Sequence, residues 1–332
     1  MSIFVKRAVA IVEKLSFIFF WRKKKYLKCK DNLFLFFSIF LFMLITSIAL
    51  YRFEELKASL CSANIYYVLS GIIFYYANYF FRSKRIVSLS HNTIPFMPQA
   101  VNISSIHGIL SYLFPLRIGD LTLPVILKKV ASIQLLEGGE MLIKARLLDI
   151  SILGFFTFCS AIIYSDTNLL FRFLWMAMGG SMMFIFSILN YLIKILPVAF
   201  SCRLPEAFRN LCRIDIISFQ DIINTFLIWV FIGLSLFSVT KAVGLNLSFQ
   251  EIWILVTIQL PLQLSPIQGV ANAGNHELGW VTALVFLGVD SDAAFQYALT
   301  SHAIFMIYVL ALIVPALISS RYLIEKRNKT NV

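Results

Sequence analysis

The segment SPIQGVANAGNHELGW, from Ser265 to Trp280, places three glycines, two asparagines, a histidine and a glutamate inside an apolar region. It lies between the runs IWILVTIQLPLQL and VTALVFLGV. If the chain around it crosses a membrane, irregular backbone at that depth survives only where protein or water surrounds it. The segment therefore predicts a broken helix that lines a polar cavity.

The composition predicts a membrane protein. Of the 332 residues, 59% are hydrophobic and 14% are charged, and the mean hydropathy is +0.82. Soluble domains contain roughly 45–50% apolar residues. The formal net charge of +12 is concentrated beside the ends of apolar runs, which indicates a role in topology and no nucleic-acid partner.

Apolar runs of this length predict an all-α polytopic fold with six full transmembrane helices. The six runs are 32–51, 62–81, 141–165, 168–196, 216–240 and 293–320. Two further stretches, 94–130 and 248–289, are interrupted by Pro, Gly and charged residues. We interpret them as re-entrant, interrupted helical hairpins.

The distribution of Lys and Arg predicts that both termini are cytoplasmic, because these residues accumulate in cytoplasmic loops. The segment 86–140 then enters from the cytoplasm and returns there, and 242–292 does the same from outside. We therefore expect a single transmembrane domain, 32–320, that contains an inverted repeat of about 62–165 and 216–320. Paired interruptions in two inverted halves are typical of a transporter's substrate site. Residues 321–332 form a predicted cytoplasmic tail.

The N-terminal segment 1–31 is basic and amphipathic. It suits an interfacial helix whose Lys and Arg side chains bind anionic membrane lipids. An ordinary basic flank that fixes orientation explains the pattern equally well. No small-residue cleavage site follows the first apolar run, so we expect that run to remain as a transmembrane helix.

The first interruption reads HGILSYLFPLRIGDLTLPVILKK, from His107 to Lys129. Arg117 at its tip has a planar donor fork that suits a phosphate or a carboxylate. Asp120 offers an internal partner, so a structural Arg117–Asp120 lock is the alternative. Arg146 and Asp149 follow at i and i+3 on the next run. They either face the bundle and the hairpin or form a surface pair.

The second interruption places Gly269, Gly274 and Glu277 where a helix must stop, turn and restart. A helix that begins near Asn275 directs its positive amide end at an anion. Glu277 is a candidate for capping this helix, pairing with a base or taking a proton. His276 and His302 are candidates for titration, and hydrogen-bonded packing is the alternative for both.

Several enzyme classes lose support because their motifs are absent from the sequence. HELGW lacks the second histidine of H-E-x-x-H, and the sequence has no P-loop, dinucleotide fingerprint or G-x-S-x-G. The five cysteines form no C-x-x-C pair. We therefore expect no metal, no cofactor and no ATP hydrolysis.

Three motifs in order give the chain a resemblance to the flippase-like family that includes the transmembrane region of lysylphosphatidylglycerol synthetases. They are PLRIGD, RLLD and PIQGVANAGNHE, and the resemblance spans roughly 32–320. It implies a protein that moves lipids or handles lipid-linked sugars for cell-envelope assembly. The chain departs from the family pattern at Ala145, which is often acidic, and in PIQG, which replaces a PGG-type turn. After 320 little sequence remains for an aminoacyl-transfer domain, so we expect no lysyl transfer by this chain alone.

The leading hypothesis is a flippase or transporter in the bacterial inner membrane that acts on an anionic phospholipid or a polyprenyl-phosphate-linked saccharide. The competing hypothesis is a membrane-embedded transferase, or an accessory subunit of a glycosyltransferase, that acts on lipid-linked sugars. In that case Asp120, Glu277 and His302 perform acid/base chemistry. A partnership with a glycosyltransferase or another envelope-assembly protein, or a homo-oligomer, is compatible with the sequence.

Overall fold

The computed structural model describes residues 30–91, 93–94, 97–163, 169–195, 217–264 and 268–330. Every regular element in these ranges is helical, and they contain no strand. Residues 1–29 lie outside them, so the interfacial N-terminal helix stays a prediction. The all-α fold class is confirmed for the described residues.

The helices form two series, separated by residues 196–216, which lie outside the described part. The first series consists of α2 (Lys30–Tyr51), α3 (Phe53–Ser62), α4 (Ile65–Leu89), α5 (Met97–Leu113), the 3-10 helix η1 (Pro115–Arg117), α6 (Thr122–Ala131), α7 (Leu135–Ile163), α8 (Leu169–Met183) and α9 (Ile185–Ile195). The second consists of α12 (Phe219–Ala242), α13 (Phe249–Leu264), the 3-10 helix η3 (Val270–Asn272), α14 (Asn275–Phe286), α15 (Ser291–Ala311) and α16 (Ile313–Thr330).

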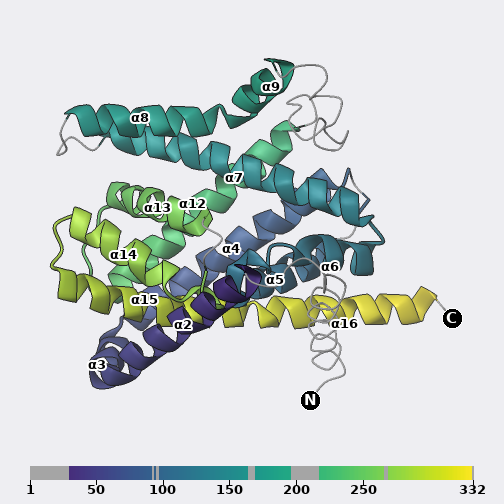
Figure 1. Ribbon diagram of the computed structural model, residues 1–332. Helices are drawn as coiled ribbons and strands as arrows, with labels where there is room; N and C mark the ends of the chain where they lie inside the picture. Colours follow the sequence, from purple (N-terminus) through teal and green to yellow (C-terminus); the bar gives the residue numbers. More distant parts are fainter. Residues whose placement is uncertain are drawn as a thin grey trace.

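One order of elements occurs twice. The series α4–α5–η1–α6–α7 is matched by α12–α13–η3–α14–α15. Helices α4 and α12 have 25 and 24 residues, α5 and α13 have 17 and 16, and η1 and η3 have three each. Helix α4 packs along α12 in the centre of the molecule, α5 packs on α6, and α13 packs on α14 (Figure 1). Both interrupted stretches are therefore helix–turn–helix hairpins.

The two ends of the bundle differ in the elements that they carry. In Figure 1, α6, the start of α7 and the C-terminus lie toward one end. Helix α3 and the turn between α14 and α15 lie toward the other.

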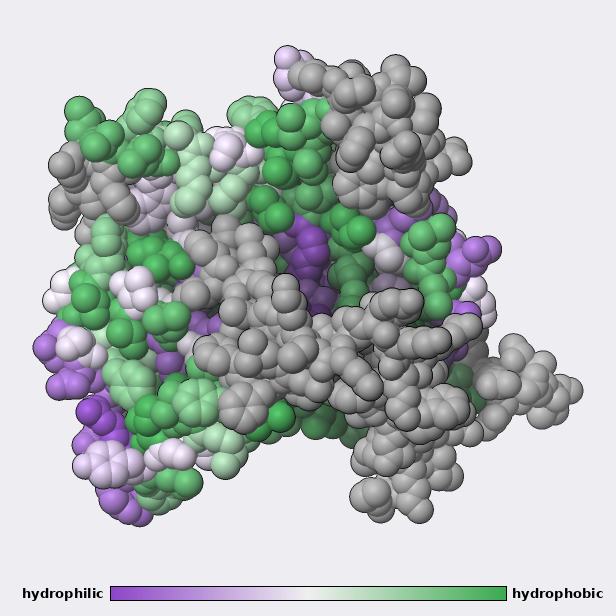
Figure 2. All heavy atoms as spheres, viewed as in Figure 1, coloured by the Kyte–Doolittle hydropathy of each residue, from purple (hydrophilic) through white to green (hydrophobic). Residues whose placement is uncertain are grey.

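The apolar surface fits a multi-pass membrane protein. In the face shown in Figure 2, hydrophobic side chains cover much of the described surface, and hydrophilic residues are visible in the middle and at the edges. Exposed large side chains include Met43 on α2 and Leu169 and Phe173 on α8. Such a surface is stable against lipid tails.

Three described helices are long and apolar enough to cross a membrane alone: α7, α12 and the segment Ser291–Ile324, which joins α15 to α16. A fourth crossing is obtained if α3 and α4, bent by 85°, count as one. Helix α2 contributes only the shorter apolar part Ile39–Tyr51, and the run 168–196 is divided between α8 and α9. The count of six full crossings therefore stays a prediction.

The helix that contains most of the second predicted span, 62–81, extends beyond the C-terminal end of that span. Helix α4 continues to Leu89, so Arg82, Lys84 and Arg85 lie within the helix and not in a loop after it. Their charges end the apolar run in the sequence but are accommodated in the fold. Arg82 lies over the Tyr79 ring at 5.4 Å, and Lys84 lies over Phe80 at 5.0 Å.

The last span also differs from its predicted bounds. Helix α15 ends at Ala311, and α16 continues to Thr330 through most of the predicted tail, 321–332. Pro315 accounts for the interruption, because its ring removes a backbone donor from the helix ladder.

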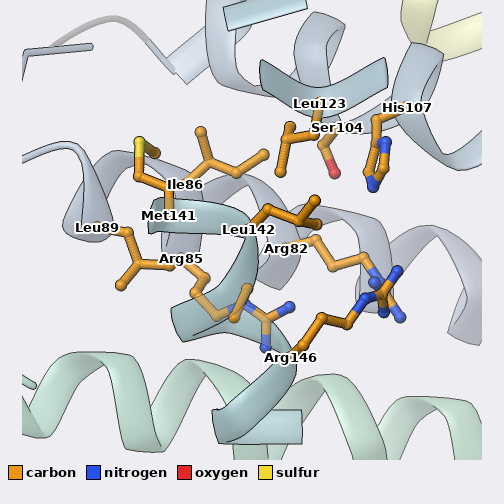
Figure 3. A pocket seen from close by; sticks show the side chains of 11 residues that line it. Arg82, Arg85, Ile86, Leu89, Ser104, His107, Leu123, Met141, Leu142 and Arg146 are labelled. Atoms are coloured by element: carbon orange, nitrogen blue, oxygen red, sulfur yellow. The ribbon is translucent and has the colours of Figure 1, made fainter. Parts of the chain in front are cut away.

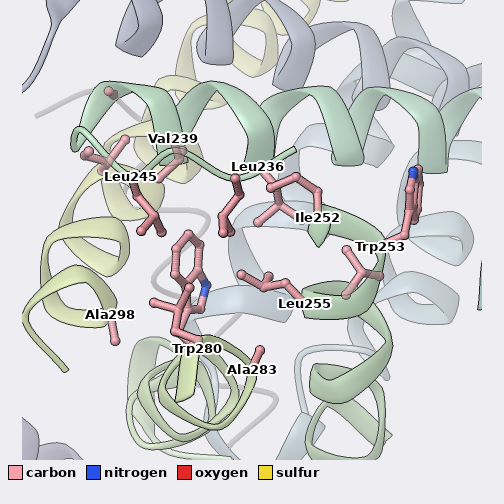
Figure 4. Close-up of a cluster of buried hydrophobic side chains, with 14 of the residues drawn as sticks. Leu236, Val239, Leu245, Ile252, Trp253, Leu255, Trp280, Ala283 and Ala298 are labelled. Carbon is pink, nitrogen blue, oxygen red and sulfur yellow. The ribbon is translucent and has the colours of Figure 1, made fainter. Parts of the chain in front are cut away.

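The largest hydrophobic core lies in the second series of helices. Trp280 of α14 is fully buried against Leu236 and Val239 of α12 and Leu255 of α13 (Figure 4). Burying an aromatic side chain of this size stabilises a fold by about 1.5–3 kcal/mol or more. This packing holds the second hairpin against the central helices.

Candidate functional site

The first break is a tight turn that its sequence dictates. Pro115 begins η1, and the amides of Ile118 and Asp120 donate to the carbonyls of Pro115 and Arg117. A Cβ atom at Gly119 would overlap the Leu110 carbonyl, so only glycine fits there. Arg117 has a φ of +54°, a conformation that L residues adopt at a cost of roughly 1–2 kcal/mol.

A chain of ion pairs connects this turn to the bundle. Asp120 contacts Arg117 through one oxygen, at 3.6 Å, and Arg146 through the other. Arg146 also contacts Asp149 at 3.5 Å. The structure thus brings together all four candidates of the first break: Arg117 pairs with Asp120, as in the lock hypothesis, and the Arg146–Asp149 pair faces the hairpin.

The chain of ion pairs ends at a buried arginine of α4. Arg85 of α4 donates to Asp149 at 2.7 Å and to Thr225 of α12 at 3.2 Å. Asp149 also accepts from the indole of Trp229 at 3.2 Å. The side chains of Arg85 and Asp149 are each only 6% exposed. A buried pair of this kind is stable only when its remaining polar atoms are also bonded.

Three arginines line one small cavity. Arg82, Arg85 and Arg146 share it with Ser104 and His107, and apolar side chains such as Leu123 complete the wall (Figure 3). Arg82 bonds to Asn78 at 2.8 Å, and among the described residues no carboxylate lies within ion-pair distance of it. The cavity volume is about 30 Å³, which is room for about two water molecules.

We call Arg82, Arg85, Arg117 and Arg146, with Asp120 and Asp149, the arginine cluster. Four guanidinium groups meet two carboxylates there, so the cluster has a formal excess of two positive charges. Guanidinium groups do not lose their protons in proteins. The excess is therefore permanent, and an anion would compensate it.

A second cavity adjoins the first, and Leu89 lines both. It has a volume of about 170 Å³ and carries Ser88, His91, Lys144, Ser218 and Asp221 on its walls. Lys144 is 9% exposed. Asp221 caps α12 by accepting from the backbone and side chain of Ser218. The arginine cluster thus lies beside a larger polar space where α4 ends and α12 begins.

The second break is built from unusual backbone. Ala271, Asn272 and Gly274 have φ values of +56°, +64° and +85°, and the turn leads into α14 at Asn275, where a helix start was predicted. Gly269 has no room for a Cβ, which would overlap the Ala273 carbonyl. Residues 265–267 of the opening segment lie outside the described part.

Glu277 and His302 form the centre of the second break. One Glu277 oxygen accepts from the Gly274 amide at 2.8 Å and caps α14. The other contacts Nδ1 of His302. Nε2 of His302 lies 2.9 Å from the Ala271 carbonyl. His302 thus connects α15 to Ala271 before the turn and to Glu277 after it.

His276 lies beside this pair without joining it. Its ring stacks on His302 at 4.7 Å between centroids, and its Nε2 lies 2.9 Å from the Ser301 hydroxyl. His276 is therefore a packing residue with a hydrogen bond to Ser301. His302 has a charged partner.

The tips of the two breaks meet. The turns η1 and η3 touch each other, α2 contacts both, and α5 contacts η3. Tyr112 of α5 lies edge-on to His302 at 6.3 Å. The nine candidate residues thus form two neighbouring clusters of different chemistry.

Sequence reasoning missed several residues of these clusters. Arg82 and Arg85 lie beyond the apolar run, and Trp229, the partner of Asp149 on α12, is 80 residues away from it. A polar or charged residue every three or four positions at the end of a span, as at Asn78, Arg82 and Arg85, is the signal that one face of the helix is polar.

The described fold and site define a polytopic helical membrane protein with two broken hairpins whose polar tips meet inside the bundle. The chain belongs to the Lysylphosphatidylglycerol synthase TM region family, whose family model matches residues 33–313. No curated protein and no solved structure matches the chain.

Proposed function

We propose that the protein is a lipid flippase or transporter of the bacterial inner membrane, which moves an anionic phospholipid or a polyprenyl-phosphate-linked saccharide for cell-envelope or surface-glycan assembly. The observation that carries the proposal is Arg82, whose guanidinium group lines the cavity of the arginine cluster and has no carboxylate within ion-pair distance among the described residues. Charged groups within a membrane protein are costly and typically mark a substrate pathway. A phosphate group would supply the missing negative charge, and guanidinium groups bind it in bidentate geometry.

The family assignment supports a lipid as the substrate, because the family is named for a lipid synthase. The exposed apolar surface supports a path in which the acyl or prenyl tails stay in the bilayer while the head group passes through the protein. The cavity has room for about two water molecules, so binding of a whole lipid head group requires movement of the first hairpin. Loss of the Asp120 contacts is the step that would free the hairpin tip.

The proposed topology has both termini in the cytoplasm and both hairpins re-entrant, in inverted orientation. The repeated order of elements and the meeting of η1 with η3 support it, because inverted repeats bring their breaks together near the membrane midplane. Single cysteines at Gln134 and Ser291, in a chain without native cysteines, test it. Gln134→Cys should react with an impermeant maleimide only from the cytoplasm, and Ser291→Cys only from outside. Labelling of both from one side contradicts the inverted arrangement.

Reconstituted liposomes test the function. The purified protein should move fluorescent phosphatidylglycerol, or a labelled polyprenyl-phosphate sugar, across the bilayer without a change in lipid mass. Phosphatidylcholine, whose head group carries no net charge, is the control lipid. Arg82→Gln should slow transport by about tenfold, because a hydrogen bond to a charged group contributes about 1.5–3 kcal/mol.

Arg172→Gln is the matched control variant. Arg172 donates to the carbonyls of Ala161 and Ile162, away from the arginine cluster, and its loss should leave the rate of transport within about twofold, since an exposed charge contributes about 0–1 kcal/mol. Wild-type protein that moves neither labelled lipid, or Arg82→Gln protein with the wild-type rate, contradicts the proposal. A wild-type protein that changes the mass of the lipid would establish the transferase alternative.

A further inference from the structure

The hydrogen bonds of His302 determine where its protons lie. Nε2 lies 2.9 Å from the Ala271 carbonyl, and a carbonyl oxygen only accepts hydrogen bonds. Nε2 therefore carries a hydrogen. The other ring nitrogen, Nδ1, contacts Oε1 of Glu277, and this contact determines whether a second proton is present.

A proton must lie between Nδ1 of His302 and Oε1 of Glu277. Without one, the nitrogen and the carboxylate oxygen would be two acceptors that face each other with no donor. The second Glu277 oxygen already accepts from the Gly274 amide. Whether the proton is assigned to the imidazole or to the carboxyl group, the pair as a whole has no net charge.

The shared proton joins three elements. Glu277 is in the first turn of α14, Ala271 is in η3, and His302 is in α15. The side chain of Glu277 is 3% exposed and that of His302 is 12% exposed. If the proton leaves, a buried carboxylate loses its donor, a change that costs about 1–3 kcal/mol or more. The contact that holds the tip against α15 is then lost.

The other groups around the pair do not replace this proton. His276 of α14 donates to Ser301, because that hydroxyl itself donates to the Ala298 carbonyl. Tyr112 of α5 faces the imidazole of His302 edge-on, and η1, which touches η3, contributes Arg117. Helix α2, which also contacts η3, has no ionisable side chain from residue 39 to residue 50.

We infer that Glu277 and His302 form a proton-binding latch on the second break. With the proton bound, the pair is neutral and the tip is closed against α15. When the proton leaves to water, the pair becomes negative and the tip is released. No other bond forms or breaks.

The latch also couples proton binding to movement of the lipid, and this coupling rests on the proposed function. A negative charge on the second tip repels an anionic head group that comes from the arginine cluster. Taking up one proton removes that charge and favours passage of the head group, so proton binding and lipid movement are coupled. A pH gradient would then drive transport.

Glu277→Gln keeps the hydrogen bonds of residue 277 but removes the proton that Glu277 shares with His302. The amide oxygen can accept from the Gly274 amide, and the amide NH₂ can donate to the unprotonated Nδ1 of His302. The variant therefore keeps both contacts of the latch while the imidazole of His302 is neutral. His302→Gln is a second variant that removes the shared proton, since its NH₂ can donate to both the Glu277 carboxylate and Ala271.

Hydrogen exchange of the purified protein in detergent tests the latch without any lipid. After correction for the intrinsic pH dependence of exchange, protection of residues 268–280 in the wild type should fall by about tenfold between about pH 5 and pH 9, a range that brackets ordinary imidazole titration. Residues 108–122 of the first break should show no such change. In Glu277→Gln and His302→Gln, protection of 268–280 should not fall as the pH rises over this range, because both contacts are complete when the remaining group is unprotonated.

Wild-type protection that does not change with pH, or that changes equally in Glu277→Gln, overturns the latch. Transport in liposomes then tests the coupling separately. Wild-type transport should change with the direction of a pH gradient, and Glu277→Gln transport should not. A pH-dependent latch in a protein that moves no lipid would contradict only the proposed function, whereas transport without any response to pH would contradict only the coupling.

Discussion

The two breaks have the same place in their helix series and opposite chemistry. The first break and the helices against it contribute four guanidinium groups and two carboxylates to the arginine cluster, and such groups keep their charges in the physiological pH range. The second contains a glutamate and a histidine that share a proton. The tips touch each other through η1 and η3. A repeated fold has thus placed a permanent positive charge next to a charge that can be switched.

This difference separates binding from control in the proposed transporter. A permanent excess of positive charge attracts an anion at every pH, and by itself it would also retain that anion. A neighbouring group that becomes neutral or negative can change how easily the anion moves on. The variants below test whether the two breaks carry these separate roles.

The strongest effect on stability is expected at Asp149. In Asp149→Leu the buried guanidinium of Arg85 loses its partner, and the free energy of unfolding should fall by about 3–5 kcal/mol. The double variant Arg85→Met/Asp149→Leu should recover most of that loss, because an apolar pair replaces the buried ion pair. Thermal unfolding in detergent, followed by tryptophan fluorescence, provides the measurement.

Glu277, the buried carboxyl group of the second break, should contribute to stability in a different way from Asp149. Glu277→Gln keeps both hydrogen bonds while His302 is neutral, so its unfolding temperature near pH 7 should remain close to that of the wild type. If Asp149→Leu is as stable as the wild type, the ion-pair chain has no structural role. If Glu277→Gln is as unstable as Asp149→Leu, the second break is held by charge as well.

The outline of both breaks was predictable from the sequence, because Pro, Gly and charge inside apolar runs are local signals. The turn at PLRIGD, the helix start at Asn275 and the cap by Glu277 follow from local chemistry. The partners of Asp149 on other helices were not predictable, because Asp149 meets Arg85 and Trp229 only through tertiary packing of α4, α7 and α12. The C-terminal extension of α4 was missed because a hydropathy pattern ends at charges that the fold pairs internally.

Substitution of the glycines in the two breaks should lower the free energy of unfolding by different amounts. Gly119→Ala forces a Cβ against the Leu110 carbonyl and should cost about 2–3 kcal/mol, in the range of overpacked cores. Gly274→Ala meets only Leu41, at 3.2 Å, and should cost about 1–2 kcal/mol for its positive φ. Gly274→Asn should cost at least as much as Gly274→Ala, since φ of +85° with ψ of −53° lies outside the left-handed helical region that asparagine tolerates. A wild-type unfolding temperature for Gly274→Ala would contradict the role of φ.

Arg117→Lys should separate function from stability in the first break. Lysine keeps the positive charge beside Asp120, 3.6 Å away in the wild type, so the unfolding temperature should hardly change. It loses the bidentate fork, and transport of labelled phosphatidylglycerol should slow by about tenfold, equivalent to about 1.4 kcal/mol. Arg172→Lys is the control. Full transport by Arg117→Lys would remove this residue from the substrate path, and loss of folded protein would favour a purely structural lock.

The smallest effect is expected at Ser301, which supports the latch without taking part in it. The Ser301 hydroxyl lies 2.9 Å from Nε2 of His276 and donates to the Ala298 carbonyl. Ser301→Ala leaves the buried N–H of His276 without its acceptor, so the free energy of unfolding should fall by about 1 kcal/mol.

The pH response of residues 268–280 should nevertheless survive in Ser301→Ala, because His302 and Glu277 keep their proton. Hydrogen exchange at low and high pH would show protection that is slightly lower than in the wild type at both and that falls by the same factor between them. If the pH response disappears instead, the shared proton depends on the His276–Ser301 contact. The latch would then comprise both histidines, and the contrast with the fixed charges of the first break would rest on a four-residue network of Glu277, His302, His276 and Ser301.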